Sequence, residues 1–407
     1  MQTNNIILFD NDARTRLLPL TYTRPICELR VGILTIREKW EKHLEGEVSY
    51  ITEDYLSDKF DIKIAEMNYI INGSVLPSEE LVTVVKGLHT NQALLHKEEL
   101  IAAKLDKAQF EYLMEKDEAE EMEGFDLKDI SFLQINDLHD IFAMNELAIK
   151  DDFKLLTKGR KSQSISETNR VVNPENIFLE PGASVECSVL NASTGPIYIG
   201  KNAQIMEGCL VRGGLAMCEN STLKMGAKIY GATTVGPWCK VGGEVNNSVL
   251  LAYSSKGHEG FLGNSVLGEW CNIGADTNNS NLKNNYAEVK LWNYATERFE
   301  PTGKQFCGLI MGDHSKCGIN TMFNTGTVVG VSANIYGGGF PRNFVPSYAW
   351  GGASGMTTYK TAKAFETAEK VMERRGKELL PIDRLILLRV FELSAGFRRW
   401  EKKTATE

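Results

Sequence analysis

The stretch LKMGAKIYGATTVGPWCKVG, Leu223 to Gly242, decides the fold that the sequence predicts. Its aliphatic residues Leu223, Ile229, Val235 and Val241 recur every six positions. This period fits neither an α-helix, which repeats after about 3.6 residues, nor one long β-strand, which repeats after about two. It fits a coil of short strands, each of which points one aliphatic side chain inward onto its counterpart in the next coil.

The same period returns in three further runs. They comprise Ile199, Ile205 and Val211; Leu267 and Ile273; and Met311, Cys317, Phe323, Val329 and Ile335. Glycine follows many of these positions directly, and 28 of the 36 glycines lie between Gly182 and Gly355. A glycine at a tight corner permits a backbone conformation that a Cβ atom disfavours. The sequence therefore predicts a parallel β-helix of hexapeptide repeats over residues 173–350.

Two segments depart from this period. Leu282 to Phe306 is polar and aromatic and predicts a hairpin that leaves one coil. Loops on a rigid scaffold often carry function, and both a subunit contact and a substrate contact stay open for it. Residues 351–407 predict a helical cap, with helices at about Thr357–Arg375 and from about Pro381 onward.

The first 155 residues follow a different pattern, in which strands alternate with helices. We expect the following elements: strands Ile6–Phe9 and Tyr69–Asn72, and helices Val31–Trp40 and Ser78–Lys86. Such alternation indicates an α/β domain with a mainly parallel, Rossmann-like sheet. Residues 156–172, which are polar and rich in lysine and serine, are predicted to be the linker to the β-helix.

The composition narrows the class of partners. A net charge of -8 argues against nucleic acid or an anionic membrane as the main partner. The chain starts without the features of a signal peptide and contains no long apolar run, so we expect a cytoplasmic protein. Its eight cysteines form no C-x-x-C pair and no histidine–cysteine cluster, so we expect reduced thiols and no metal site there.

One histidine stands out in the glycine-rich half. It is His258, in the stretch SSKGHEGFLGNSVLGEWCNIGADTNNSN from Ser254 to Asn281. Aliphatic–glycine pairs follow it at spacings of five and then six, ending at Gly263, Gly268 and Gly274. The other histidine of the β-helix, His314, is expected to be structural.

This stretch resembles the acetyltransferase half of a bifunctional family, N-acetylglucosamine-1-phosphate uridyltransferase/glucosamine-1-phosphate acetyltransferase, which makes UDP-N-acetylglucosamine. The matching features are His258, the aromatic Phe261, the glycine spacing, and Asn281 after G-A-x-T. The resemblance covers Ile177–Gly339 and is closest over Lys256–Asn281. It implies a left-handed β-helix that forms a homotrimer and binds acetyl-CoA in the groove between subunits.

The resemblance also implies roles for single residues. His258 would be the general base that takes a proton as a sugar amine attacks the thioester, and Asn281 would orient the acceptor or polarise the carbonyl. Lys256 and Phe261 would contact the substrate, although the family has tyrosine at the latter position. Its basic residues for the sugar phosphate have no clear match here, and the candidates that replace them are Arg212 and Lys304, with Lys228 and Lys240 as further ones. The predicted reaction is acetyl transfer to an amino sugar that carries a phosphate or a nucleotide.

The N-terminal stretch LFDNDARTRLLPLTYTRP, Leu8 to Pro25, resembles a second family motif. Sugar nucleotidyltransferases have G-x-G-T-R-L-x-P-L-T followed by P-K, and residues 16–21 match its second half. The two glycines are replaced by Asp12 and Arg14, and the lysine by Ile26. Glycines let backbone N–H groups approach phosphates closely, whereas an aspartate repels them.

The metal position of that family is also changed. Where the family has an aspartate for Mg²⁺ after an apolar strand, this chain has Ser74. Arg14, Arg16 and Arg24 are candidates to bind a nucleotide or phosphate at what would be the remnant of the site, and Mg²⁺ is expected only if this domain is active. Two alternatives to acetyl transfer therefore stay open: nucleotidyl transfer to a sugar 1-phosphate, and a non-catalytic trimeric regulator that binds nucleotide sugars.

Overall fold

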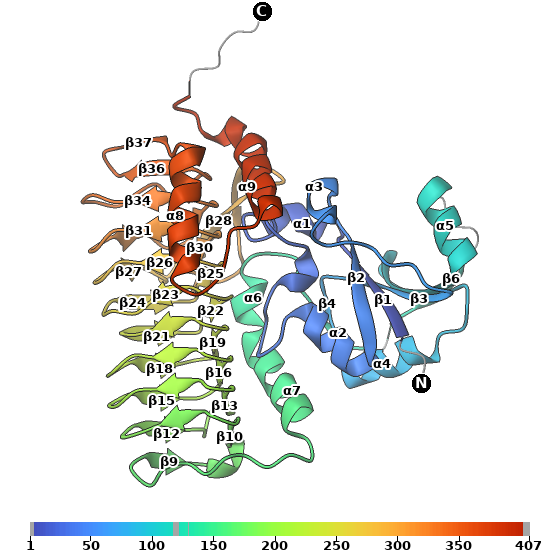
Figure 1. Cartoon of the computed structure of the whole chain (residues 1–407), viewed down its shortest axis with the longest axis horizontal. Coiled ribbons are helices and arrows are strands. Elements are labelled where there is room, and N and C mark those ends of the chain that lie inside the picture. The colour runs from blue at the N-terminus through green and yellow to red at the C-terminus, as the bar shows by residue number, and fades with distance from the viewer. Residues whose placement is uncertain (1–3, 117–121, 129, 402–407) are drawn as a thin grey trace, which may run out of the picture. The chain divides into compact units, whose positions relative to one another are not determined.

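A computed structural model describes residues 4–116, 122–128 and 130–401 of the 407-residue chain (Figure 1). These residues form two compact units, which are described separately. Unit 1 comprises residues 4–17, 24–29 and 34–137, as far as they are described. Unit 2 comprises residues 18–23, 30–33 and 138–401, so two short segments of the N-terminal sequence belong to it.

Unit 1 is built on a six-stranded sheet in the order β2-β1-β3-β6-β5-β7. Its strands are β1 (Asn4–Phe9), β2 (Gly46–Ile51), β3 (Met67–Asn72), β5 (Gln92–His96), β6 (Glu99–Asp106) and β7 (Glu123–Asp126). Strands β1, β2 and β3 run parallel, as do β5 and β7, but β6 runs antiparallel to both neighbours. Both predicted strands are present, in β1 and β3. The sheet is mainly parallel, as predicted: β1, β2, β3, β5 and β7 point the same way, and β6 is antiparallel to them.

The helices of unit 1 show why one predicted boundary was wrong. They are α1 (Ala13–Arg16), η1 (Ile26–Glu28), α2 (Ile36–Leu44), α3 (Asp54–Ser57), α4 (Glu79–Gly87) and α5 (Lys107–Lys116), and a short pair joins β4 (Val75–Leu76) to β8 (Leu133–Gln134). The helix predicted at Val31–Trp40 is α2. It begins later because Thr35 accepts from the Glu38 N–H while the Glu38 carboxylate accepts from the Thr35 N–H, a capping box. Helix α4 has the predicted cap at Ser78.

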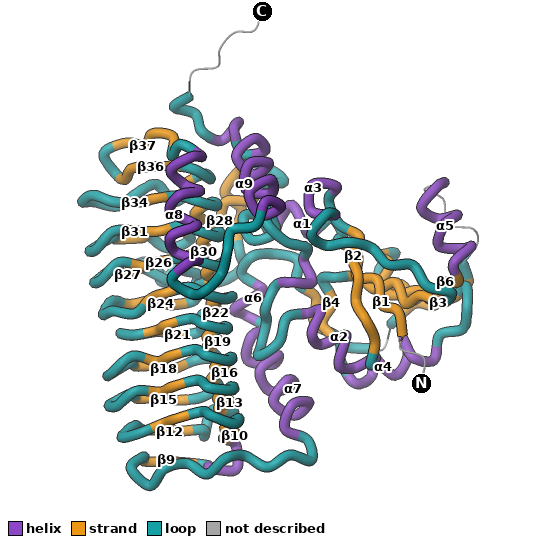
Figure 2. Tube along the Cα trace, viewed as in Figure 1, coloured by secondary structure: helices purple, strands orange, loops and turns teal. Residues whose placement is uncertain are grey.

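Unit 2 is a stack of coils whose short strands form three parallel sheets (Figures 1 and 2). Sheet 1 contains β10 (Ile177–Leu179), β13 (Ile197–Ile199), β16 (Leu215–Met217), β19 (Thr233–Val235), β22 (Val249–Leu250), β25 (Val266–Leu267), β30 (Leu309–Met311), β33 (Thr327–Val329) and β35 (Phe344–Val345). Sheet 2 contains β11 (Ser184–Val185), β14 (Gln204–Ile205), β17 (Thr222–Leu223), β20 (Lys240–Val241), β23 (Ser255–Lys256), β26 (Asn272–Ile273), β31 (Lys316–Cys317), β34 (Asn334–Ile335), β36 (Ala349–Gly352) and the antiparallel β37 (Gly355–Thr358). Sheet 3 contains β9 (Arg170–Val172), β12 (Val189–Asn191), β15 (Leu210–Arg212), β18 (Lys228–Tyr230), β21 (Glu244–Asn246) and β24 (Phe261–Gly263), and β27 (Asn278–Asn279) pairs separately with β32 (Met322–Phe323). This is the predicted left-handed parallel β-helix.

The residues of the six-residue period form the core of this β-helix. Every periodic aliphatic residue, together with Cys317 and Phe323, is buried in one continuous hydrophobic cluster. Ile199, Met217 and Val235 illustrate the stacking, since each pairs with the next across adjacent coils of sheet 1. The glycine that follows Val235 is required by close approach, because a Cβ atom on Gly236 would lie 1.7 Å from the Leu251 carbonyl oxygen.

Helices and one hairpin complete unit 2. They are α6 (Asp140–Ala143), α7 (Asn145–Thr157), η2 (Pro174–Asn176), α8 (Thr361–Glu373), α9 (Pro381–Leu393), η3 (Ala395–Phe397) and the hairpin β28 (Lys290–Asn293) with β29 (Arg298–Pro301). The hairpin confirms the prediction for the excursion from Leu282 to Phe306. Helix α8 begins after Thr358 because that residue ends β37. Helix α9 packs on the last coils, where the Tyr348 hydroxyl donates to the Leu387 carbonyl at 2.7 Å. Across the described part of the chain, no helix combines the length and the apolar character needed to span a membrane.

Candidate functional site

His258 lies on the turn that joins β23 to β24 in the middle of the β-helix. Main-chain hydrogen bonds fix this turn on both sides. Gly242 N–H donates to the Lys256 carbonyl at 2.7 Å, and Asp276 N–H donates to the Glu259 carbonyl at 3.0 Å. The turn is therefore held between the preceding and the following coil.

Two glycines make this close packing possible. Gly243 has a φ of +70°, and a Cβ atom on it would lie 2.8 Å from the His258 carbonyl oxygen. Gly260 has a φ of +118°, and a Cβ atom on it would lie 2.1 Å from the Thr277 carbonyl oxygen. Side chains at either position would displace the turn, so these glycines help to set where His258 sits.

Lys256 occupies a position where the other coils have an aliphatic side chain. It pairs with Val241 in sheet 2 and is only 1% exposed. Its ammonium donates to the carbonyl oxygens of Gly242, at 2.9 Å, and His258, at 2.7 Å. Burial lowers the pKa of Lys256 to about 8, because the charged form loses its hydration; the carboxylate of Glu259 opposes this effect. The structure thus places the predicted substrate-contacting lysine inside the coil, beneath the turn.

The His258 side chain itself is exposed. Within residues 4–116, 122–128 and 130–401, no hydrogen bond or ion pair engages its imidazole. Its neighbour Glu259 accepts from Lys228, with 3.3 Å between Nζ and the carboxylate oxygen. Lys228, one of the further basic candidates from the sequence, therefore reaches the His258 turn even though its strand lies two positions away in sheet 3.

Phe261 begins β24, and its side chain meets Asn281 over Gly263, which ends the strand. A Cβ atom on Gly263 would lie 2.5 Å from the Phe261 ring and 2.7 Å from the Asn281 amide nitrogen, so both side chains cover the same glycine. The Asn281 amide also donates to the Asn264 side-chain oxygen at 2.8 Å. In one chain, His258 and Asn281 thus flank opposite ends of β24.

Asn279 is a residue that sequence reasoning missed. It is 3% exposed and pairs with Phe323, whereas the neighbouring coils have the apolar residues Leu262 and Phe323 inside. Its amide oxygen accepts from the Gly263 N–H at 2.9 Å, and its amide nitrogen donates to the Gly263 carbonyl at 3.0 Å. An asparagine on the inward period was the available signal. Asn279 and Lys256 are polar residues inside the β-helix, and they support the two ends of the same strand.

Two predicted residues do not join this group within one chain. Arg212 ends β15, which is three strands from β24 in sheet 3, a separation of about 14 Å at the usual strand spacing. Lys304 is exposed and follows the hairpin, where its main chain accepts from the Val289 N–H at 2.9 Å.

In unit 1 the predicted phosphate-binding residues Arg14 and Arg16 have carboxylate partners. Arg14 is buried and lies 3.5 Å from both Asp10 and Glu53. Arg16 is half-exposed and lies 3.6 Å from Asp137. A phosphate would have to compete with these carboxylates. Arg24 is also buried.

The position of the missing metal aspartate is part of a buried amide network. The Ser74 hydroxyl donates to the Asn72 side-chain oxygen at 2.7 Å. Beside it, the Glu99 carboxylate accepts from Asn11, Asn72 and Gln134. Amide donors that surround a single carboxylate do not form a Mg²⁺ site, which needs several oxygen ligands turned toward the ion. Among the residues that the structure describes, no group of three or more histidine, cysteine, aspartate or glutamate side chains could hold a metal ion.

Comparison with known protein families identifies the N-terminal region. Residues 6–161 match the model of a family described as sugar nucleotidyl transferase. The predicted sugar nucleotidyltransferase-like character of this region is thereby confirmed, and the region is similar to a family of transferases. No curated protein sequence matches the chain.

Several solved structures share features with part of the chain. The polySia-specific acetyltransferase NeuO is 14% identical, with a TM-score of 0.26 over 47% of this chain and 82% of its own. A UDP-N-acetylglucosamine acyltransferase from Arabidopsis is 17% identical, with a TM-score of 0.25 over 60% and 85%. AntD, an N-acyltransferase from Bacillus cereus in complex with dTDP and coenzyme A, is 13% identical, with a TM-score of 0.22 over 52% and 87%. At these TM-scores the likeness does not bear on function.

Proposed function

We propose that the β-helix catalyses transfer of an acetyl group from acetyl-CoA to the amine of a sugar that carries a phosphate or a nucleotide. The observation that carries this proposal is an exposed imidazole at His258, on a turn fixed by a buried lysine and two glycines. An exposed side chain on a rigid support is what a general base requires, because it must reach substrate without losing its orientation.

The chemistry assigns His258 one proton transfer. The neutral sugar amine attacks the thioester carbonyl, a C–N bond forms, and the C–S bond breaks. His258 takes the proton that the amine loses, and the thiolate of coenzyme A leaves and is protonated. In this proposal, Asn281 donates to the carbonyl oxygen as negative charge develops there.

Lys256 and Phe261 support His258 and Asn281 in this proposal. Lys256 holds the His258 turn through its carbonyl oxygen and is a positioning residue in this proposal, without substrate contact. Phe261 supplies an apolar surface beside Asn281. Because His258 and Asn281 flank opposite ends of β24 in one chain, we propose that the complete site needs a neighbouring subunit of a homotrimer.

The test is an assay of thiol release from acetyl-CoA with purified full-length protein. Glucosamine 1-phosphate, glucosamine 6-phosphate and amino sugars linked to a nucleoside diphosphate are the acceptors to compare. We expect acceptor-dependent thiol release with at least one of them, and an acetylated product by mass spectrometry. No release with any acceptor would reject the proposal.

The family match of residues 6–161 favours a second candidate, nucleotidyl transfer to a sugar 1-phosphate. Against it stand the carboxylate partners of Arg14 and Arg16 and the amides around Glu99. We therefore propose that this domain does not transfer a nucleotidyl group. Pyrophosphate release with each NTP, Mg²⁺ and a sugar 1-phosphate tests this, and release with any pair would establish transfer.

A further inference from the structure

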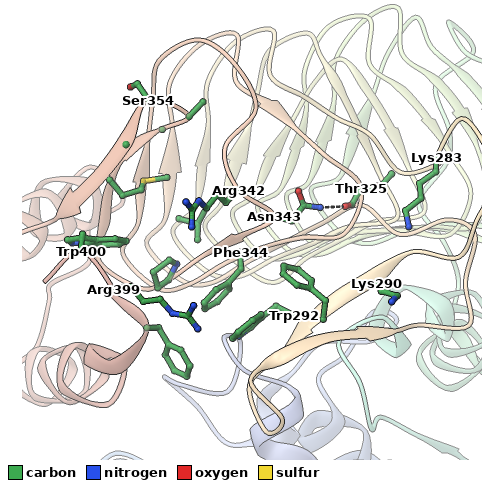
Figure 3. A pocket seen from close by; sticks show the side chains of 18 residues that line it. Lys283, Lys290, Trp292, Thr325, Arg342, Asn343, Phe344, Ser354, Arg399 and Trp400 are labelled. Carbon is green, nitrogen blue, oxygen red and sulfur yellow. Dashed lines mark hydrogen bonds between the residues drawn. The ribbon is translucent and has the colours of Figure 1, made fainter. Parts of the chain in front are cut away.

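A cavity of about 1020 Å³ lies in unit 2 between the hairpin, the last coils and the C-terminal segment (Figure 3). Its walls come from Lys283 and β28, from residues 342–346, from residues 352–356, and from residues 397–400. All of these segments belong to one chain and one unit. The cavity begins two residues after Asn281 along the chain.

Four cationic side chains line this cavity: Lys283, Lys290, Arg342 and Arg399. Figure 3 shows the two lysines at one end and the two arginines toward the other, with Trp292 and Phe344 between them. No aspartate or glutamate belongs to the lining. No ion pair joins any of the four to a carboxylate in the described ranges, although Lys283 donates to the Glu288 carbonyl at 2.6 Å. Four cations that line one cavity give it a positive potential, which favours an anionic ligand.

An aromatic cluster forms the surface between the charged ends. Trp292 stacks on Phe344 with ring centres 4.2 Å apart and an angle of 12° between the planes. Phe397 meets both rings edge-on, which ties the hairpin, the last coil and the C-terminal segment together. Phe344 and Trp400 remain half-buried, and Phe299 is 40% exposed. The cavity therefore offers flat apolar surface as well as positive charge.

We infer that this cavity binds a nucleotide that carries at least two phosphate groups. The aromatic surface would hold the base, and the lysine and arginine pairs would bind phosphate oxygens. The volume is large enough for such a ligand, since pockets for small ligands measure roughly 300–1,000 Å³. Two sources supply this chemistry: the 3′-phosphorylated adenosine diphosphate of coenzyme A, and a nucleotide sugar. The coenzyme A source rests on the proposed acyl transfer, whereas the nucleotide-sugar source does not.

The test is titration calorimetry of the full-length protein with four probes: coenzyme A, dephospho-coenzyme A, UDP-N-acetylglucosamine and inorganic pyrophosphate. The variants are K283A/K290A and R342A/R399A. The matched control is K363A/R374A, which removes two exposed cations of α8 and its end that do not line the cavity. Circular dichroism melting checks that every variant is folded.

We expect coenzyme A or UDP-N-acetylglucosamine to bind, and each cavity variant to weaken that binding by at least about tenfold, while the control leaves it unchanged. Tighter binding of coenzyme A than of the dephospho form would identify coenzyme A as the source. The inference is overturned if neither nucleotide binds, if both cavity variants bind normally, or if pyrophosphate binds as tightly as the nucleotides. Its failure is distinct from that of acyl transfer, because an active enzyme with normal binding in both cavity variants would reject the cavity alone.

Discussion

The buried ammonium of Lys256 donates a hydrogen bond of 2.7 Å to the main-chain carbonyl of His258. A polar group inside the β-helix thus supports an exposed group on its surface. Burying a charge is costly, and the carboxylate of Glu259 offsets that cost only in part, since the pKa of Lys256 remains lowered. The arrangement is understandable if the position of the His258 turn matters more than stability.

This cost predicts how stability depends on pH. The pKa of Lys256 falls from 10.5 in the unfolded chain to about 8 in the folded one, so the unfolded state binds more protons between these values. The free energy of unfolding therefore gains from Lys256 as the pH rises from about 8 to about 10.5. Compared with K256M, which cannot titrate there, the wild type should gain on the order of 3 kcal/mol across this window. Urea unfolding at each pH measures it.

A second lysine, Lys316, makes the comparison of the wild type with K256M necessary. Burial lowers its pKa to about 8 as well, so the wild type alone would combine two groups. Equal pH slopes for wild type and K256M would show that Lys256 does not carry a buried charge.

The close approach at Gly236 predicts a position-specific effect of alanine. G236A places a methyl group against the Leu251 carbonyl, and we expect a loss of about 3 kcal/mol or more. Gly318 is the matched control, because it also follows an inward residue but the nearest atom to its Cβ would be 3.5 Å away. Thermal melting of both variants tests this, and equal losses would contradict the account of the glycine pattern.

Asn281 should affect turnover more than stability. N281A removes one hydrogen bond to Asn264 on a partly exposed side chain, so we expect a loss of about 1 kcal/mol in stability. If its amide stabilises the transition state, kcat should fall by about 100-fold with little change in KM. N284A, in the exposed start of the excursion, is the control. An unchanged kcat would remove Asn281 from the catalytic group.

Arg14 is predicted to be structural in its present environment. R14A leaves the buried carboxylate of Asp10 without its cation, and we expect a loss of about 3 kcal/mol at neutral pH. Burial already raises the pKa of Asp10, although Arg14 opposes this effect. Without Arg14 that pKa should rise further, so the loss should shrink as the pH falls and Asp10 is protonated. R16A, whose side chain is 40% exposed, should cost under about 1 kcal/mol by the same urea titration. Equal effects of the two variants would contradict the difference in burial.

The β-helix was predictable because its rule is local. Each inward position is fixed by the spacing to the last one, and glycine marks the corners. Lys256 obeys this rule as well, since it follows Leu250 by six residues and precedes Leu262 by six, and both of these leucines are buried in the core. Its inward position was therefore visible in the spacing, but the prediction counted apolar residues only and passed over a lysine.

Ion-pair partners that lie far apart along the chain could not be predicted from the sequence. Arg14 has one local carboxylate partner, Asp10, but its second partner, Glu53, and the partner of Arg16, Asp137, come from distant segments. The cationic cavity likewise combines four separate segments, so only the fold could reveal it. The start of helix α2, by contrast, could have been predicted from the sequence, because the T-x-x-E capping box at Thr35 marks it.

The most direct test of the central claim is the rate of thiol release from acetyl-CoA in H258A, with the acceptor that the wild type uses. The control is H89A, which removes an exposed histidine from unit 1. We predict that H258A lowers kcat by about 100-fold or more while the melting temperature and coenzyme A binding are unchanged, and that H89A is fully active. A wild-type rate in H258A would contradict the assignment of His258 as the general base.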